Sequence, residues 1–473
     1  MIEGYNNSAS KEGCVPANVA NAEINRKLDI LLRTGCLLIE SHADTSRTLR
    51  NMKRVAAFLG IHEKNLHISI NYDVIIVNLS DEFHSFTEIR CCQGHSVNLW
   101  AIMKVSKLTW NCIKDDYTME RYEDELEKIR THKRNYTPWE VAAGGGFACG
   151  GFCIQFGCDW TAFFYASIAA ILGFRLKMWM AEKGMNAYVG IAIAAFVSTL
   201  IAWGFVLFSM NTSVPLLHSS TPYHPFMACA LYLVPGVPLI NFVSDMLASH
   251  FRPGIVRAVN TLMIVLAMAF GIAFAIEVCG VDNFVKTLSM TPHHEYWEYS
   301  LAAAISAMGF SMIFNCPPRL LWTVAMGGII AICTRNLVSL GPSTHNFGLD
   351  MGSVIGTFAG SAVISIICTK LIHVVHAPHQ CISIPSVIPM VPGVLMYRAL
   401  FAFIDMHGVV GEVTVAMTNL INASLIILCI SLGVAIPNIF FRKLIAPRRE
   451  RKMIDLVVQR RLRHSNTFND EGM

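Results

Sequence analysis

The sequence predicts an α-helical polytopic membrane protein with about ten transmembrane helices, arranged as two inverted five-span repeats, and a small cytoplasmic α+β N-terminal domain. Three observations lead to this class. Of the 473 residues, 53% are hydrophobic and only 15% are charged, and the apolar residues form long runs from Pro138 onward. Residues 1–135 contain no run long enough to span a bilayer. A Val-Pro-Gly-Val motif occurs at Val234 and again at Val391, 157 residues later.

The charge pattern narrows the choice of partners and places the chain ends. A net charge of +4 is too small to suggest a nucleic-acid partner, and we expect no cofactor. The basic run "RKLIAPRRERK" begins at Arg442, and it predicts that residues 442–473 are a cytoplasmic tail at the membrane edge. The opening "MIEGYNNSASKEG" lacks the pattern of a cleaved signal peptide, which predicts a cytoplasmic N-terminus. Many of the fifteen cysteines lie in apolar runs, where they are typical packing residues rather than a disulfide framework.

Residues 1–135 are expected to form the cytoplasmic domain. The stretches "EINRKLDILLRTGCLLIESHA" and "DTSRTLRNMKRVAAFLGI" place apolar residues at helical spacing. The β-branched or alternating segments "NLHISINY", "DVIIVNL" and "SFTEIRCC" predict a small sheet. Two further helices are expected over "HSVNLWAIMKVSKLTWNCI" and "YTMERYEDELEKIRTHK".

The apolar runs after Pro138 predict two membrane repeats, over residues 136–280 and 281–441. The ten expected spans are 138–156, 160–178, 187–209, 226–248, 255–278, 298–315, 319–336, 350–373, 382–404 and 413–440. An even number of spans puts both termini on the same side, and the basic residues between spans favour the cytoplasmic side for both.

A shift of 157 residues brings most of the first five spans onto the last five. The stretches "FGC" before the second span and "FNC" before the seventh agree with this shift within one residue. Because five is an odd number, the second copy enters the membrane in the opposite direction. This is the inverted-repeat plan of secondary transporters.

The repeated motif predicts a broken helix in each half. Pro235 with Gly236, and Pro392 with Gly393, remove backbone donors and tolerate irregular backbone. Interrupted segments at matching positions of two halves indicate a transport site, because freed backbone groups can hold a polar ligand. The alternative is that both motifs are packing kinks, which membrane helices tolerate well.

Polar residues just after each break are the candidate substrate-binding or coupling groups. Asn241 and Asp245 are four residues apart, so they share one helical face and are expected to point into one cavity. Alternatively, Asp245 touches water at the end of a span. Tyr397 and Arg398 take the matching place in the second half. The Arg398 guanidinium suits a substrate carboxylate, or else it snorkels or pairs with Asp245.

Asp159, before the second span, has two interpretations. It could gate the site or bind a proton, or it could be a helix N-cap, which aspartate fills well.

Two other motifs have weaker chemical interpretations. The stretch "HVVHAPHQC" gathers four candidate metal ligands without a zinc-finger spacing, namely His373, His376, His379 and Cys381. The stretch "SHADTSR" gathers the residue types of a hydrolase, namely His42, Asp44, Ser46 and Arg47. Residues so close along one helix seldom form a nucleophile triad, and we expect neither a metal site nor catalysis here.

Several of these motifs, in order, resemble the threonine/serine exporter family. "ESHADTSRTLRNMKRVAAFLGI" is similar to its opening signature, "FGCDW" to its Phe-Gly-Gly-Asp-Trp stretch, and "VPGVPLINFVSDML" with "GIVRAVN" to its proline-broken span. "IPMVPGVLMYRAL" is similar to the matching motif of its C-terminal half. The resemblance runs from about residue 26 to 440. Two departures are His42 and Cys158, where the family often has glycine.

The resemblance implies export of small hydroxylated amino acids, driven by the proton motive force, across a bacterial inner membrane. In related systems the halves are separate polypeptides and the proposed cargo is a dicarboxylate. Carried onto this chain, it implies a transport core made of the two Pro-Gly breaks and four polar residues, Asp159, Asn241, Asp245 and Arg257.

The combined prediction is a proton-coupled secondary transporter that exports threonine or serine through the lipid bilayer and is not an enzyme. Its partners are a small-molecule substrate and protons, and a homo-oligomer is possible. A dicarboxylate exporter is the first alternative, although it calls for two fixed positive charges and only Arg398 is well placed. A membrane sensor or hydrolase acting through the N-terminal domain is the second.

Overall fold

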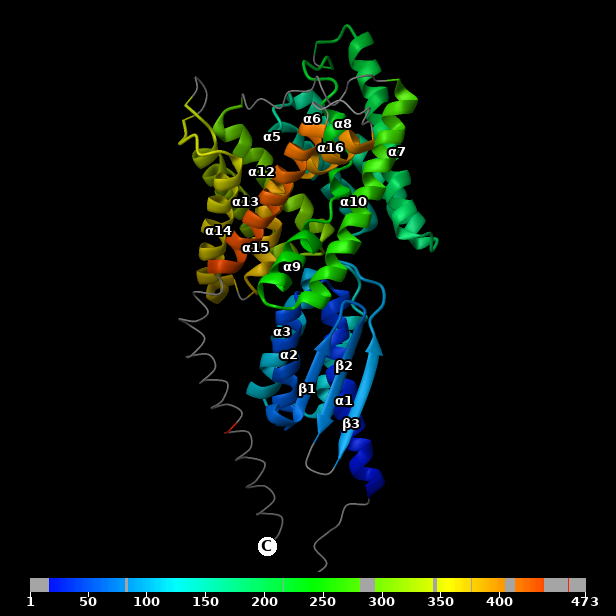
Figure 1. The fold of residues 1–473 in the computed structure, drawn as a ribbon, viewed down its shortest axis with the longest axis vertical. Coiled ribbons are helices and arrows are strands. Elements are labelled where there is room, and N and C mark those ends of the chain that lie inside the picture. The colour runs from blue at the N-terminus through cyan, green and yellow to red at the C-terminus, as the bar shows by residue number, and fades with distance from the viewer. Residues whose placement is uncertain are drawn as a thin grey trace, which may run out of the picture.

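The computed structural model describes eight stretches of the chain: residues 17–80, 84–215, 217–280, 294–342, 347–375, 377–404, 413–437 and 458. Two parts are visible in Figure 1, a mixed head built from the N-terminal residues and a bundle of helices above it. The basic tail predicted over 442–473 lies outside the described residues, apart from Val458.

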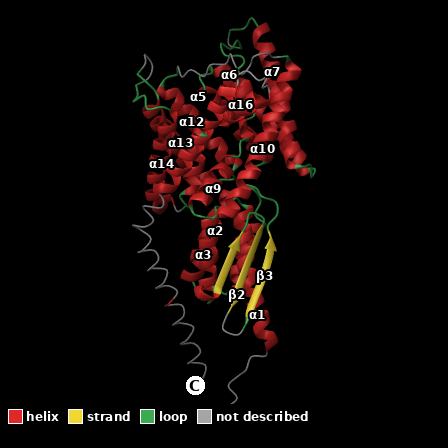
Figure 2. Ribbon diagram, in the orientation of Figure 1, coloured by secondary structure: helices red, strands yellow, loops and turns green. Residues whose placement is uncertain are grey.

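Over residues 17–80 and 84–135, the head has four α-helices and one three-stranded antiparallel sheet in the order β1-β2-β3 (Figure 2). Its elements are α1 (Ala17–Glu40), α2 (Thr45–Phe58), β1 (Leu66–Ile70), β2 (Val74–Ser80), β3 (Ser85–Cys91), α3 (Leu99–Lys114) and α4 (Met119–Arg130). The predicted helices and strands of this region are therefore confirmed.

Local chemistry explains where these elements begin. Asp44 caps α2 by accepting a hydrogen bond from the Arg47 amide, as the Asp-Thr start predicts. Alternation along β2 buries Ile75 and Val77 against the helices, while Ile89 on β3 is exposed on the outer face. The sheet therefore has one face packed on the head's core and one open face.

In the described parts of the chain, the bundle contains eight continuous helices and two broken ones. The continuous helices are α5 (Pro138–Gln155), α6 (Trp160–Glu182), α7 (Ala187–Asn211), α10 (Phe251–Cys279), α12 (Tyr296–Ile313), α13 (Leu321–Ser339), α14 (Ser353–Val375) and Val413–Pro437. The broken ones are α8 (Pro225–Ala228), η2 (Leu231–Leu233) and α9 (Gly236–Leu247), and α15 (Gln380–Val387), η4 (Ile388–Met390) and α16 (Gly393–Ile404).

Helix occupies all ten ranges that the sequence predicts as spans. Among the described residues, six helices are long and apolar enough to cross a membrane: α6, α7, α10, α13, α14 and Val413–Pro437. The chain is thus a polytopic membrane protein, and the count of ten spans stays a prediction.

Helices α5 and α12 pack closely against each other. A Cβ atom built on Gly309 would lie 2.2 Å from the carbonyl oxygen of Gly144, and one on Gly151 would lie 2.6 Å from that of Ala302. Only glycine allows two helix backbones to approach this closely. The glycine-rich stretch of α5 is therefore a packing surface, as its composition suggests.

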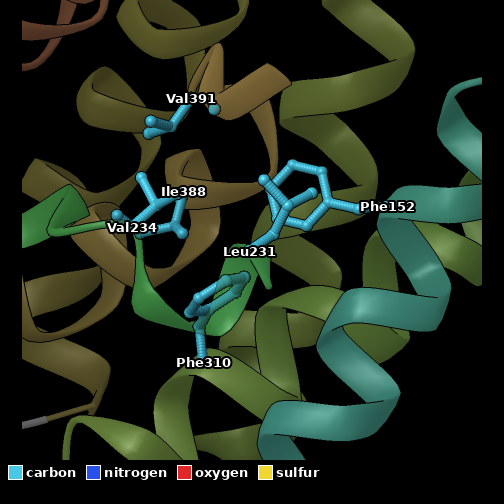
Figure 3. A pocket seen from close by; sticks show the side chains of 7 residues that line it. Phe152, Leu231, Val234, Phe310, Ile388 and Val391 are labelled. Atoms are coloured by element: carbon cyan, nitrogen blue, oxygen red, sulfur yellow. The ribbon is translucent and has the colours of Figure 1, made fainter. Parts of the chain in front are cut away.

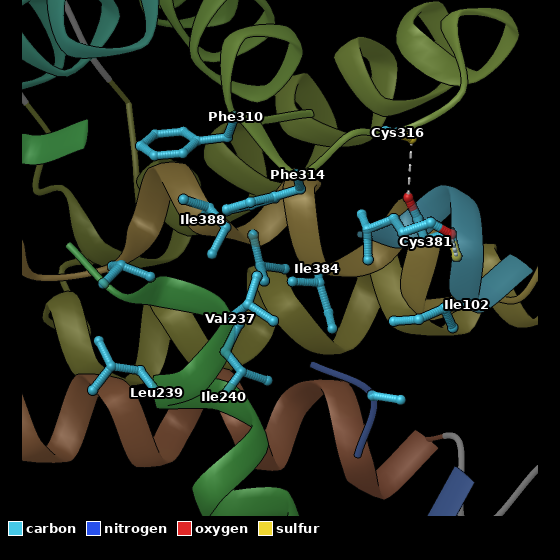
Figure 4. Packing of buried hydrophobic residues seen from close by; sticks show 14 of the residues in the cluster. Ile102, Val237, Leu239, Ile240, Phe310, Phe314, Cys316, Cys381, Ile384 and Ile388 are labelled. Carbon is cyan, nitrogen blue, oxygen red and sulfur yellow. Dashed lines mark hydrogen bonds between the residues drawn. The ribbon is translucent and has the colours of Figure 1, made fainter. Parts of the chain in front are cut away.

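Hydrogen bonds from the start of α3 join the head to the bundle. The Leu99 amide donates to the Phe314 carbonyl at the end of α12 (2.9 Å), and Asn98 and Asn315 bond through their side chains. Cys381 of α15 donates to the Leu99 carbonyl, next to the apolar cluster drawn in Figure 4. One short segment of the head thus contacts two bundle helices that lie far apart in the sequence.

Candidate transport site

Both proline motifs interrupt their helices at the predicted positions. Pro235 leaves the helical conformation (φ −79°, ψ 62°) just before α9 begins at Gly236. In the second half, the chain turns extended at Val391 (φ −64°, ψ 129°) before α16 begins at Gly393. Because Pro lacks the N–H that would continue the helix, each motif divides its segment into two short helices.

The two breaks lie against each other in the middle of the bundle. A Cβ atom on Gly236 would lie 2.4 Å from Cδ1 of Ile388, and a Cβ atom on Gly393 would lie 2.6 Å from Cδ2 of Leu231. Each break therefore accepts an apolar side chain from the opposite broken helix. A Cβ atom at either glycine would require the Ile388 or the Leu231 side chain to shift.

A small apolar cavity remains between the breaks (Figure 3). Its volume is about 10 Å³, room for about one water molecule. The residues around it are Phe152, Leu231, Val234, Phe310, Ile388, Val391 and Gly393. The cavity between the breaks is too small for a molecule the size of an amino acid in this conformation.

A buried ion pair lies at the end of the bundle that faces the head, which we call the head-side end. Nε of Arg257 on α10 is 3.1 Å from Oδ2 of Asp245 on α9, and each side chain is 1% exposed. Thr45 of the head donates its amide to Oδ1 of Asp245 (2.9 Å) and its hydroxyl to Oδ2 (3.0 Å). A carboxylate so far from water needs this many partners to remain charged.

The loop between α1 and α2, residues 41–44 together with Thr45, reaches into this end of the bundle through its backbone as well. Asn241 donates to the His42 carbonyl (2.7 Å), and Nη2 of Arg257 donates to the Ala43 carbonyl (2.8 Å). We call residues 41–47, which comprise this loop and the first turn of α2, the docking loop. Asn241 and Asp245 thus share one face of α9, as their spacing predicts, and Arg257 of α10 lies beside Asp245; all three bind the docking loop rather than line an open cavity.

Arg257 keeps buried donors that are not used by these contacts. Neither Nε nor Nη1 has a directed hydrogen bond to any acceptor in the described parts of the chain, although Nε is close enough to Asp245 for an ion pair. The Tyr72 ring lies under the guanidinium, 5.4 Å from its Cζ atom. A buried guanidinium with vacant N–H groups is suited to an added carboxylate.

The His42 side chain is buried, and its backbone conformation is strained. Its φ of 62° is unusual for a non-glycine residue, which explains why glycine suits this position. Burial, with Arg257 and His95 nearby, lowers the pKa of His42 to about 3. The docked loop therefore requires a neutral imidazole.

Acidification is expected to release the docking loop. A released His42 would regain its ordinary pKa near 6.5, so docking is at full strength above pH 6.5. It weakens by up to about 1.4 kcal/mol per pH unit as the pH falls from 6.5 toward 3. Burial also lowers the pKa of His95, which acts in the same direction. Hydrogen exchange of residues 41–47, compared with α4 in the same sample, should show lost protection at pH 5.

The matched control for this prediction is His42→Asn, because asparagine also tolerates a positive φ but does not titrate. Protection in this variant should change much less between pH 7.5 and pH 5. Equal losses of protection in the variant and the parent protein would show that His42 is not the responsive group.

The docking loop also binds the second broken helix. Asp44 pairs with Arg47 (3.3 Å), whose Nε donates to Oε1 of Gln380 at the start of α15 (2.8 Å). Burial by itself would raise the pKa of Asp44, but Arg47 and Arg50 outweigh it and hold that pKa below its ordinary value. One loop therefore holds α9 and α15 together. The sequence analysis did not single out Thr45, Tyr72 or Gln380 as site residues. Each lies within a stretch that the sequence analysis considered for another reason, "SHADTSR", "NLHISINY" and "HVVHAPHQC" respectively.

Asp159 lies at the opposite end of the bundle, where it has a structural role. It caps α6 by accepting from the Ala162 amide (2.7 Å), and its carboxylate also accepts from Ser219 and Ser220. The N-cap interpretation is therefore confirmed. The carboxylate holds the loop before α8 against the start of α6.

Replacing Asp159 should separate capping from proton coupling. Asp159→Ala is expected to lower the free energy of unfolding by about 0.5–2 kcal/mol, whereas Asp159→Asn retains a capping oxygen and loses less. Thermal unfolding of both variants in detergent checks this order. If Asp159→Asn instead keeps full stability and abolishes the pH dependence of transport, the proton-binding interpretation is correct.

The polar residues of the second half lie away from Asp245. Arg398 is half-buried on α16, which runs from the break toward the end of the bundle opposite the head (Figure 1). Tyr397 is on the same helix, and its side chain lies outside the described residues. Asp245 pairs with Arg257 and not with Arg398, which was one of the alternatives that the sequence left open for Arg398.

The contacts do not assemble a hydrolase from the "SHADTSR" motif. Ser46 Oγ is 3.2 Å from Nε2 of His250, not from His42, and the Asp44 carboxylate is engaged by Arg47. Of the four candidate metal ligands, only His379 and Cys381 have described side chains. No cluster of three or more metal-binding side chains occurs where side chains are described.

The bundle consists of apolar helices, and two of its segments are broken where they meet. A buried ion pair follows one break, and the head docks over it. Together these features define a polytopic membrane protein of the transporter class. A family model described as "Putative threonine/serine exporter" matches residues 29–279, and one described as "Threonine/Serine exporter, ThrE" matches residues 299–440. The chain therefore belongs to the threonine/serine exporter family, a family of exporters rather than enzymes.

Curated relatives are similar at low identity. "Threonine/serine exporter" of Corynebacterium glutamicum is 18% identical over 435 residues, 91% of this chain and 85% of the relative. "Probable threonine/serine exporter" of Mycobacterium tuberculosis is 18% identical over 84% of this chain and 73% of the relative. "Probable succinate transporter subunit YjjP" of Escherichia coli is 23% identical over 54% of this chain and 96% of the relative. No solved structure matches this chain.

Proposed function

We propose that this protein is a secondary transporter that exports small carboxylate-bearing metabolites, threonine or serine first, in exchange for protons. The observation that carries the proposal is the ion pair of Asp245 and Arg257, 1% exposed and placed directly after a broken helix. Buried charges in membrane helices are costly and mark substrate or ion pathways. The family membership favours export as the direction.

The proposed architecture has ten spans in two inverted repeats, covering residues 136–280 and 281–441, after a head formed by 1–135. The reciprocal contacts of the two breaks support it. Gly236 meets Ile388 and Gly393 meets Leu231, and a shift of 157 residues exchanges the two contacts. A pseudo-two-fold axis through the central cavity accounts for this exchange, as in transporters built from inverted repeats.

In the proposed mechanism, Arg257 holds the substrate carboxylate. Its Nε and Nη1 groups, which make no directed hydrogen bond in this conformation, donate to that carboxylate, while the Asp245 carboxylate is the counter-charge for the substrate ammonium group. Protonation of Asp245 from the opposite side removes this counter-charge and weakens substrate binding, so the proton and the substrate occupy the site alternately, as exchange requires. Arg257 replaces Arg398 in this role because Arg257 is beside Asp245.

The head acts as the cytoplasmic gate in this proposal. Its docking loop covers the ion pair and connects α9 to α15, so substrate cannot enter from the head side until the loop leaves. The positive-inside pattern supports cytoplasmic termini in a bacterial inner membrane. Rocking of the two repeats about the central breaks then exposes the site alternately to each side.

Efflux from proteoliposomes tests the proposal. Liposomes containing the purified protein are loaded with labelled threonine, serine or succinate, and efflux is followed with and without an imposed proton gradient. Gradient-dependent efflux of threonine or serine is expected. Asp245→Asn should abolish the dependence on the gradient, whereas the surface control Glu182→Gln should not. Asp245 is not the coupling group if the Asp245→Asn variant exports at the parent rate with the same pH dependence.

Two other outcomes address the alternatives. Efflux of succinate alone would identify a dicarboxylate exporter, which the succinate-transporter relative favours and the lone guanidinium at Asp245 does not. Absence of any efflux from folded protein would favour a sensor or hydrolase acting through the head. Deletion of 1–135 separates these classes, because a transporter should retain ligand binding in its membrane part.

A further inference from the structure

Two buried cysteines of the head lie in direct contact. Sγ of Cys92, just after β3, is 3.0 Å from Sγ of Cys36 on α1. Cys36 is 5% exposed and Cys92 is 4% exposed, and the two residues are 56 positions apart in the sequence. Two thiols held this close by separate elements can be joined without moving the backbone far. The neighbouring Cys91 is exposed.

We propose that Cys36 and Cys92 form a reversible disulfide when the cytoplasm becomes oxidising, with a small peroxide as the oxidant. The inference does not depend on the transport function. Metal binding is a weaker explanation, because the described residues around the pair provide no third ligand and structural metal sites need about four. Cytoplasmic disulfides are usually transient and redox-sensing.

The contact distinguishes the two thiols chemically. The hydrogen bond donated by Cys92 lowers the pKa of Cys36, while burial and Glu40 oppose this effect. The same hydrogen bond, with burial, raises the pKa of Cys92. Cys36 is therefore the attacking thiolate and Cys92 the resolving thiol.

The reaction then balances in two steps. The Cys36 thiolate attacks one oxygen of hydrogen peroxide and breaks the O–O bond, giving a sulfenic acid on Cys36 and hydroxide, which takes up a proton as water. Cys92 loses its proton and attacks the Cys36 sulfur, forming the S–S bond and expelling the sulfenic oxygen as a second water. Two thiols are oxidised, and one peroxide is reduced to two waters.

The position of the pair connects it to the docking loop. Cys36 is one helical turn before Glu40, whose carbonyl accepts from the Ser96 amide (2.9 Å) and whose carboxylate accepts from the Gln93 amide (3.1 Å). A disulfide would therefore fasten the end of α1 to the segment after β3, directly at the base of residues 41–47. Oxidation should make this part of the head more rigid.

Mass spectrometry of the full-length protein in detergent micelles tests the proposal. Reduced protein is treated with hydrogen peroxide, its remaining thiols are alkylated under denaturing conditions, and it is digested without reduction. A linked Cys36–Cys92 peptide, two hydrogens lighter than its reduced parts and absent after dithiothreitol, is expected. The midpoint of thermal unfolding should rise by several degrees in the oxidised sample.

Two comparisons make the result decisive. Cys91→Ser should leave the linked peptide unchanged, while Cys36→Ser should eliminate it. Cys316 and Cys381 serve as an internal reference, because the Cys316 thiol donates to the Cys381 carbonyl rather than to the other sulfur. Full alkylation of Cys36 and Cys92 at peroxide doses that oxidise Cys91 would overturn the proposal, as would a Cys36–Cys91 link.

Discussion

Replacing Arg257 with methionine is expected to abolish export and to destabilise the junction of head and bundle by about 3–5 kcal/mol. The substitution removes one partner of a pair that is 1% exposed, which leaves the Asp245 carboxylate buried without a compensating charge. It also removes the hydrogen bond to the Ala43 carbonyl. Chemical unfolding in mixed micelles measures the stability, and proteoliposome efflux measures the activity.

The double variant Asp245→Asn with Arg257→Met distinguishes the lost charge from the lost packing. Because it removes both charges, it should recover most of the stability while export remains absent. The control is Arg175→Met, since Arg175 and Glu182 form a more exposed pair at 3.8 Å that contributes about 0–1 kcal/mol. A small loss in Arg257→Met, similar to that control, would mean that the junction does not depend on this pair.

Gly309→Ala is expected to have the second largest effect, because the new methyl group has no space. Its Cβ atom would lie 2.2 Å from the Gly144 carbonyl oxygen and 2.9 Å from the Ala148 side chain. The nearest atom belongs to a helix backbone, so α5 and α12 must separate. We expect a loss of about 1–3 kcal/mol or more, visible as a lower temperature of aggregation for the detergent-solubilised protein.

Gly204→Ala on α7 is the matched control, with the opposite expected sign. A Cβ atom there meets nothing within 4 Å, and alanine in a helix interior is about 0.5–1 kcal/mol more favourable than glycine. The pair of variants adds the same methyl group to two helical glycines. Equal shifts of the two variants in the same direction would show that the α5–α12 approach does not limit stability.

Local patterns in the sequence were sufficient to predict the elements. Helical spacing of apolar residues predicted α1 and α2, β-branched alternation predicted the three strands, and the proline motifs predicted both breaks. The capping role of Asp159 could also be predicted, because a cap depends on residues only three positions away. Each of these features is decided within a few residues of chain.

The partners of the candidate site could not be predicted in the same way. The internal repeat aligned Arg398 with Asn241, and Asp245 was one alternative partner for Arg398, yet Asp245 binds Arg257 and, 200 positions away, Thr45. The "SHADTSR" motif suggested chemistry of its own, but its backbone carbonyls and Thr45 satisfy buried groups of α9 and α10. The residue types along the chain do not show which distant backbone group will pair with a given buried side chain.

The sequence by itself determined the membrane class, the helices and strands, the two breaks and the list of costly polar residues. These features follow from hydrophobicity, periodicity and the missing N–H of proline, all of which act locally. Only the tertiary structure decided that the head's docking loop covers the ion pair and that each broken helix inserts a side chain at the other's glycine. Such contacts join distant segments, and the requirement that every buried charge and backbone group find a partner selects among them only when the whole chain is packed.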